Sequence, residues 1–192
     1  MKTKTLLASF LIGLMVACAP ATKLERTWAD PSFTPATTKP FTKVLIVAPL
    51  KDQAAQRIAE DKIAAQLKQG VGVQSYTYLQ PSDTDPKLVD AKLKKDGFDG
   101  VIVMRLKDVE KSTSYTPGTS YGGWYGYRNY SPGYYTENKT FVVETNFYSL
   151  ESNKLLWTGT TSTLNPASFG KTMDEIITCI KFDIQKKGFL KK

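Results

Sequence analysis

Four acidic residues near the ends of expected strands are the first side chains in this sequence that could do chemistry. A pair of carboxyl groups about 5 to 10 Å apart can cleave a glycosidic bond when one of them has a raised pKa. These residues are Asp99, Asp108, Glu110 and Glu144. Their spacing along the chain does not distinguish them from ordinary surface charge. We therefore expect a protein without enzymatic activity, and a carboxylate-dependent enzyme acting on glycan stays open as an alternative.

The chain contains no histidine. Histidine is the usual general base near neutral pH, the partner of serine and cysteine nucleophiles, and the commonest zinc ligand. The sequence also contains neither a glycine-rich phosphate-binding motif nor two cysteines separated by two residues. These features predict no catalytic residue, no metal site and no cofactor.

The chain of 192 residues is basic, with 26 basic and 18 acidic side chains and a net charge of +8. A positive surface suits anionic partners such as lipid headgroups, acidic glycans or nucleic acid. The basic residues are dispersed, however, and form no dense arm or arginine-rich helix. We expect no nucleic-acid partner.

The first residues have the pattern of an export signal. Lys2 and Lys4 precede an apolar run that ends in LMVAC, and this run is too short to span a bilayer as a permanent helix. LMVAC resembles the lipobox of bacterial lipoprotein signals, in which a small residue, here Ala17, precedes an invariant cysteine, here Cys18. The resemblance implies that residues 1–17 are a signal peptide and that Cys18 receives diacylglycerol and an acyl chain such as palmitate. A plain secretory signal is the alternative.

Two further expectations follow from the cysteines. Ala19, rather than aspartate, follows Cys18. By the same resemblance, this implies an anchor in the bacterial outer membrane, with the protein facing the periplasm. Cys179 is then the only thiol left in the sequence, so we expect no disulfide within the chain. Its place in an apolar helical pattern predicts a small core residue, with a reactive thiol as the alternative.

The stretch SYGGWYGYRNYSPGYY lies in a glycine- and tyrosine-rich segment, residues 112–136, which we predict as a loop between two strands. Such long connections are either functional or disordered, and disordered segments are normally poor in aromatic residues. Tyrosine and tryptophan give binding loops a large contact area with few rotatable bonds. The segment could stack on glycan, grip a protein or lie among lipid headgroups, and a packed loop covering the sheet edge is the alternative. The candidate contact residues are Tyr121, Trp124, Tyr125, Tyr127, Arg128, Tyr130, Tyr134 and Tyr135.

The rest of the chain divides into a tether and one domain. Residues 18–42 contain four prolines and predict a tether after the attachment site, within which Trp28 and Phe33 favour a short edge strand. Residues 43–190 have the regular pattern of an α/β domain. Strands are expected at residues 43–50, 71–79, 98–110, 139–150 and 152–163, and helices at residues 52–70, 82–97 and 165–188.

Helix ends and helix faces can also be predicted. Asp52 and Asp85 are expected to cap the first two helices, and Asn165 is expected to cap the last. The acidic residues at 60 and 61 are expected on a solvated face of the first helix. The order β-α-β-α-β-β-β-α predicts a mixed sheet of five strands, three of them parallel and two in an antiparallel hairpin, with three helices in a two-layer or three-layer domain.

The lipobox and this order of elements resemble small envelope lipoproteins that share the fold of the TolB N-terminal domain, the curli secretion lipoprotein and the lipoprotein activators of penicillin-binding proteins. The stretches TWADPSF, FTKVLIVAP and RIAED are also similar to an uncharacterised family of bacterial lipoproteins. We expect a lipid-anchored interaction or scaffolding module of the cell envelope, which binds an envelope protein or peptidoglycan through the aromatic segment, and the resemblance to the activators of penicillin-binding proteins makes cell-wall assembly one version of this role. A subunit of an oligomeric secretion assembly is a further alternative. It would need a longer hairpin than residues 139–163, and the oligomeric state stays open.

Overall fold

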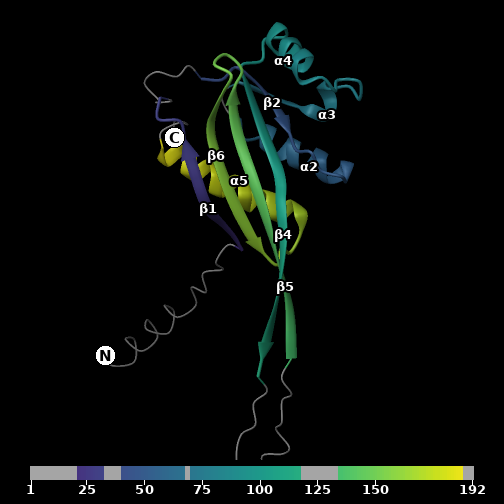
Figure 1. The fold of residues 1–192 in the computed structure, drawn as a ribbon, viewed down its shortest axis with the longest axis vertical. Helices are drawn as coiled ribbons and strands as arrows, with labels where there is room; N and C mark the ends of the chain where they lie inside the picture. The colour runs from purple at the N-terminus through teal and green to yellow at the C-terminus, as the bar shows by residue number, and fades with distance from the viewer. Residues whose placement is uncertain (1–20, 33–39, 68–69, 118–133, 188–192) are drawn as a thin grey trace, which may run out of the picture.

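One mixed sheet with helices on both faces forms the body of the protein (Figure 1). The structure, a computed structural model, describes residues 21–32, 40–67, 70–117 and 134–187. The strands are β1 (Thr22–Ala29), β2 (Lys43–Val47), β3 (Val71–Gln74), β4 (Gly100–Thr116), β5 (Tyr134–Ser149) and β6 (Lys154–Leu164). The helices are α2 (Gln53–Ala64), α3 (Ser75–Tyr78), α4 (Pro86–Lys95) and α5 (Phe169–Lys186).

The strand order is β1-β6-β5-β4-β2-β3. β2 pairs in parallel with β3 and β4, while β5 and β6 pair antiparallel, so the predicted α/β class and mixed sheet are confirmed. The predicted count was wrong, because the described residues form six strands and four helices rather than five and three. The additional elements are the edge strand β1 and the single turn α3.

β1 begins at Thr22, inside the segment predicted as a tether, and pairs with β6 along its length. It confirms the edge strand expected around Trp28 and is longer than expected; Phe33 lies outside the described residues. Thr22 is buried, and its hydroxyl donates to Glu175 Oε2 at 2.8 Å. The Thr163 hydroxyl lies 2.9 Å from Thr22 Oγ1. These bonds fix the start of β1 against α5.

Two apolar clusters hold the layers together. The larger lies between the sheet and helices α2 and α5, and includes Ile46, Trp157 and Ile176, each at most 1% exposed. The smaller lies on the other face, where Leu93 of α4 packs against Leu45 and other residues near β2. The apolar run of β2 therefore reflects burial on both faces, as its sequence predicts.

The predicted N-terminal caps are confirmed for two of the three helices. Asp52 and Asp85 cap α2 and α4 as predicted, each accepting from backbone N–H groups of the first turn. The predicted cap of the last helix was wrong, because Ser168 caps α5 and the helix begins at Phe169. Asn165 instead adopts a left-handed conformation, with φ of 45°, and its amide oxygen accepts from the backbone N–H of Lys139.

Candidate interaction site

A long hairpin of β4 and β5 extends beyond the rest of the sheet (Figure 1). β6 accompanies β5 only as far as the pair of Thr140 with Leu164. Beyond it, residues 111–116 of β4 and 134–139 of β5 form six cross-strand pairs. We call these twelve residues the arm. Six residues at a strand rise of about 3.4 Å give the arm a length of about 20 Å.

The end of the arm is aromatic, hydroxylated and uncharged. Its last three pairs are Ser114 with Thr136, Tyr115 with Tyr135, and Thr116 with Tyr134. The rings of Tyr115 and Tyr135 lie with centroids 4.8 Å apart, and the exposed fractions of Tyr115, Tyr134 and Tyr135 are 55%, 60% and 74%. Side chains of this size are normally at least half buried in a folded domain, so three exposed tyrosines within one short segment distinguish the arm from the body.

The predicted loop at residues 112–136 is therefore corrected at both ends. Residues 112–116 continue β4, and residues 134–136 begin β5. Of the predicted contact residues, Tyr134 and Tyr135 lie together on the arm. The others lie outside the described residues, as does Cys18; they are Tyr121, Trp124, Tyr125, Tyr127, Arg128 and Tyr130.

Polar contacts fix the root of the arm to the body. Asn165 donates its backbone N–H to Lys139 O at 2.8 Å and its side-chain amide to Asn138 Oδ1 at 2.7 Å. On the neighbouring strands, Arg105 donates through two nitrogens to Glu144 Oε1, at 2.6 and 3.0 Å. A fork of this kind restricts both side chains more than a single bond would. The arm thus continues a sheet whose register is fixed on both sides of its root.

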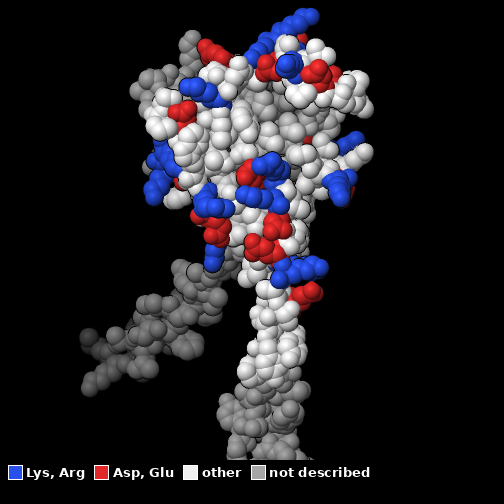
Figure 2. Space-filling view, viewed as in Figure 1, with Lys and Arg blue, Asp and Glu red and all other residues white. Residues whose placement is uncertain are grey.

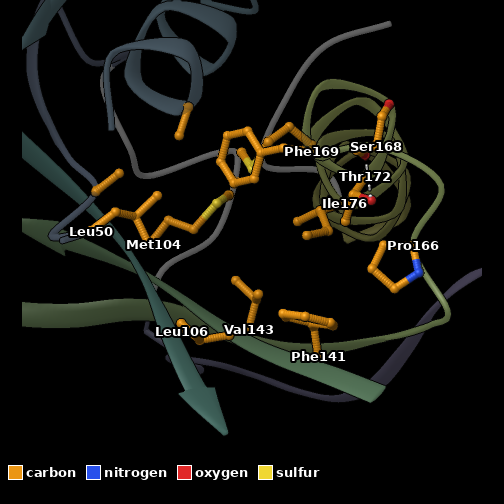
Figure 3. Close-up of a pocket in the computed structure, with 13 residues that line it drawn as sticks. Leu50, Met104, Leu106, Phe141, Val143, Pro166, Ser168, Phe169, Thr172 and Ile176 are labelled. Atoms are coloured by element: carbon orange, nitrogen blue, oxygen red, sulfur yellow. Dashed lines mark hydrogen bonds between the residues drawn. The ribbon is translucent and has the colours of Figure 1, made fainter. Parts of the chain in front are cut away.

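An apolar cavity of about 310 Å³ lies beside the root, between the sheet and the first turns of α5 (Figure 3). Leu106 and Phe141 face it from β4 and β5, and Phe169 faces it from α5. Its two hydroxyl-bearing residues, Ser168 and Thr172, are engaged in the N-terminal cap of α5. Its size lies at the lower end of the range for ligand pockets, and its lining suits an aliphatic or aromatic group.

Three of the four carboxylates considered for catalysis accept hydrogen bonds from neighbouring groups, and the fourth, Glu110, is exposed. Asp99 accepts from the backbone N–H and hydroxyl of Thr42 and joins β2 to β4. Asp108 accepts from its neighbour's N–H at a bulge in β4, and Glu110 is exposed on the same strand. The hydrogen bond from Asn146 and the fork from Arg105 hold the pKa of Glu144 below its usual value. A general acid needs the opposite shift.

Glu60 is a buried acidic residue whose burial the sequence did not reveal. We expected it on a solvated helix face, but its side chain is 0% exposed. Its Oε1 accepts from Ala48 N at 2.9 Å, Gln56 Nε2 at 3.0 Å and Ser75 Oγ at 2.7 Å, and its Oε2 accepts from Tyr76 N at 3.2 Å. The carboxylate thus ties α2 to the ends of β2 and β3. A buried carboxylate that accepts four hydrogen bonds has a structural role, because it holds these elements together.

Cys179 is half-buried on α5, with its Sγ 3.8 Å from Thr22 O. Burial, and to a lesser degree the charge of Glu175, raises the pKa of its thiol, which disfavours the nucleophilic thiolate. Within the described residues there is no group of three or more side chains that could hold a metal ion. Among the described helices, none is long and apolar enough to cross a membrane.

No protein-family model matches this chain, and no curated protein matches its sequence. Solved structures are similar to it over most of its length. A PelC dodecamer from Paraburkholderia phytofirmans is 7% identical, covers 83% of this chain and 95% of its own, and gives a TM-score of 0.46. Lipoprotein GNA1162 from Neisseria meningitidis is 13% identical, covers 76% of this chain and 99% of its own, and gives a TM-score of 0.42. The hypothetical protein CT253 from Chlamydia trachomatis is 8% identical, covers 77% of this chain and 96% of its own, and gives a TM-score of 0.38.

A lipoprotein is thus among the structures that this chain is similar to, but these values do not extend the likeness to function. The resemblance to the TolB domain, the curli secretion lipoprotein and the activators of penicillin-binding proteins stays a prediction. The candidate site therefore depends on the geometry of the arm. One sequence signal could have revealed it: residues 112–116 and 134–136 are serine, threonine and tyrosine throughout, and the last two types favour strands.

Proposed function

We propose that this protein is a non-enzymatic interaction module of the bacterial cell envelope, which contacts its partner through the arm and the aromatic segment that joins its strands. The observation behind this proposal is the β4–β5 extension. It holds exposed tyrosines about 20 Å from the body, where they contribute nothing to the core. Exposed aromatic rings on a fixed backbone make efficient contact surfaces, because little conformational entropy is lost on binding.

The proposal includes a lipid anchor on Cys18, with the protein on the periplasmic side of the outer membrane. The lipobox-like residues LMVAC support the anchor. An acylated chain of this kind has several acyl groups on one residue, which is enough for stable attachment to a bilayer. An envelope protein, peptidoglycan and the membrane itself are the partners that such an arm could meet, and nucleic acid is not among them.

The competing proposal of a carboxylate-dependent glycan hydrolase has less support. Asp99 is engaged by backbone and hydroxyl donors, and the lowered pKa of Glu144 keeps that group ionised at neutral pH. A hydrolase of the usual kind needs one protonated acid beside one ionised carboxylate.

Photo-crosslinking in intact cells tests the proposed function. A diazirine amino acid replaces Tyr135 at the arm end or, as a matched control, Glu151 in the turn at the opposite end of β5. We expect adducts from position 135, whether protein, glycan or lipid by mass spectrometry, and none of the same kind from position 151. A protein that folds normally but gives the same adducts, or none, at both positions would refute the proposal.

A shortened chain provides the second part of this test. Ser112 and Asn138 are cross-strand partners, so residues 113–137 can be replaced by Asn-Gly, which closes a two-residue hairpin. The described residues among those removed, 113–117 and 134–137, lie outside both apolar clusters, and the shortened domain is expected to unfold at the same urea concentration as the full chain. It is also expected to lose the function of the full chain in cells. Full function of the shortened chain would contradict the proposal.

A further inference from the structure

The start of the sheet lies at the root of the arm. Ala21, the first described residue, accepts a hydrogen bond from Leu164 N at 3.1 Å, and Leu164 is the cross-strand partner of Thr140 at the arm root. β1 then runs away from the arm, because it pairs antiparallel with β6. The chain that precedes Ala21 therefore enters the domain at the end from which the arm leaves.

The connection between Cys18 and the sheet is short. Ala21 is the third residue after Cys18, and a fully extended chain of three residue steps spans about 10 Å. The arm extends about 20 Å from the same level. Directed straight at the bilayer, the arm end would lie about 10 Å deeper than Cys18, so an arm tilted by about 60° from the bilayer normal places its end at the depth of Cys18. Such a short connection brings the arm end to the membrane surface.

We infer that the tyrosine-bearing end of the arm docks on the headgroup layer of the bilayer that holds the acylated Cys18. This inference rests on the proposed function, including its lipid anchor, and it names the membrane as the arm's partner. Tyr115, Tyr134 and Tyr135 provide three exposed rings with phenolic hydroxyls, the side-chain type that accumulates at membrane interfaces. All six residues of the last three pairs carry a hydroxyl group and none carries a charge.

The backbone of the arm favours the headgroup layer over the hydrocarbon core. Along residues 111–116 and 134–139, the two strands pair with each other and with no further strand in the part of the chain that the structure describes. Their outer N–H and C=O groups need water or lipid headgroups as hydrogen-bond partners, which the hydrocarbon core does not provide. The arm therefore lies at the interface.

The charges near the root are balanced and do not select anionic lipid. Figure 2 shows acidic and basic side chains mixed around the root and an uncharged surface beyond it. In residues 107–111 of β4 and 137–139 of β5, basic and acidic residues number three each: Lys107, Lys111, Lys139, Asp108, Glu110 and Glu137. Docking is therefore expected to depend on the rings, with little effect of salt or of the anionic fraction of the membrane.

A depth measurement with the acylated full chain tests this inference. In a Cys179→Ser background, an environment-sensitive probe is attached at Thr116→Cys on the arm end or at Glu151→Cys, the matched control at the opposite end of the domain. The protein is reconstituted in vesicles of phosphatidylcholine, with and without phosphatidylglycerol. Some vesicles contain lipids with a nitroxide close to the headgroup, and others contain lipids with a nitroxide deep in the chain.

We expect shallow nitroxides to reduce the fluorescence of the probe at position 116 at least about twofold, in both lipid compositions. Deep nitroxides should reduce it less. The fluorescence of a probe at position 151 should not change. Replacing Tyr115, Tyr134 and Tyr135 with serine should abolish the quenching without changing the urea midpoint. An unquenched probe at position 116 overturns the inference. In that case, protein or glycan adducts from position 135 in cells would mean that the proposed function stands with another partner. If position 135 gives no adducts either, the inference and the proposed function both fail.

Discussion

Replacing Glu60 with glutamine tests how the buried carboxylate contributes to stability. Three of its four hydrogen bonds end on Oε1, so the amide oxygen of glutamine would take that position. The amide nitrogen would then face the N–H of Tyr76, and two donors would oppose each other. The remaining three bonds would also lose the strength that the negative charge gives them.

The size of the effect follows from these contacts. A lost bond to a charged group costs about 1.5 to 3 kcal/mol, and an unpaired buried donor costs about 1 to 3 kcal/mol. Removing the charge from the interior offsets part of this cost. We expect Glu60→Gln to lower the free energy of unfolding by about 2 to 3 kcal/mol. Urea unfolding followed by tryptophan fluorescence measures it, since Trp157 is buried in the core.

The neighbouring residue gives a matched control. Asp61 is exposed and accepts from the Tyr76 hydroxyl at 2.7 Å and from Gln74 Nε2 at 2.9 Å. Because water can replace both bonds, Asp61→Asn should change the free energy of unfolding by less than about 1 kcal/mol. If Glu60→Gln folds normally and is as stable as Asp61→Asn, the buried carboxylate is not the tie described above.

Three further predictions concern stability and reactivity. Gly70 has a φ of +93°, and an added Cβ would lie 2.4 Å from a backbone oxygen, whereas Gly97, at +79°, has open space around it. Gly70→Ala should therefore cost at least about 3 kcal/mol and Gly97→Ala about 1 kcal/mol in thermal unfolding, and equal costs would contradict this. The lowered pKa of Glu144 contributes stability above its pKa in the unfolded chain, and that stability is lost as the pH falls through the lower folded value. The urea midpoint of Glu144→Gln should consequently fall less in acid than that of the unmodified chain, and parallel pH profiles would refute this. Because burial raises the pKa of Cys179, iodoacetamide should alkylate it more slowly at neutral pH in the folded chain than in urea, and equal rates by mass spectrometry would exclude this.

The sequence predicted the elements whose pattern is local. The apolar run of β2 and the Asp85–Pro86 start of α4 each contain their own signal, and both are present in the structure. β1 begins earlier than its sequence suggests, because an edge strand shows little apolar periodicity and Thr22 is buried through contacts with β6 and α5. The burial of Glu60 was not predictable, because its donors come from residues up to 16 positions away along the chain.

The arm shows the same limit at the candidate site. Its aromatic composition identified the segment as a surface for contact, but its hydroxyl-rich residues were assigned to a loop. Strand pairing over six residue pairs beyond the end of β6 depends on the register fixed in the body, where Arg105 and Glu144 are cross-strand partners. A pattern along one strand does not contain that register.

Hydrogen exchange of the arm amides tests the central claim, that the arm is the contact element, most directly. In a two-stranded extension, outward-facing amides lack a protein partner and exchange rapidly unless something covers them. Peptides covering residues 109–117 and 134–140 are compared between isolated envelopes that contain the acylated protein and the purified Cys18→Ser chain in solution. We predict slower exchange of these peptides in the envelope, with unchanged exchange in the β5–β6 turn. Identical exchange of the arm in both samples would contradict the account.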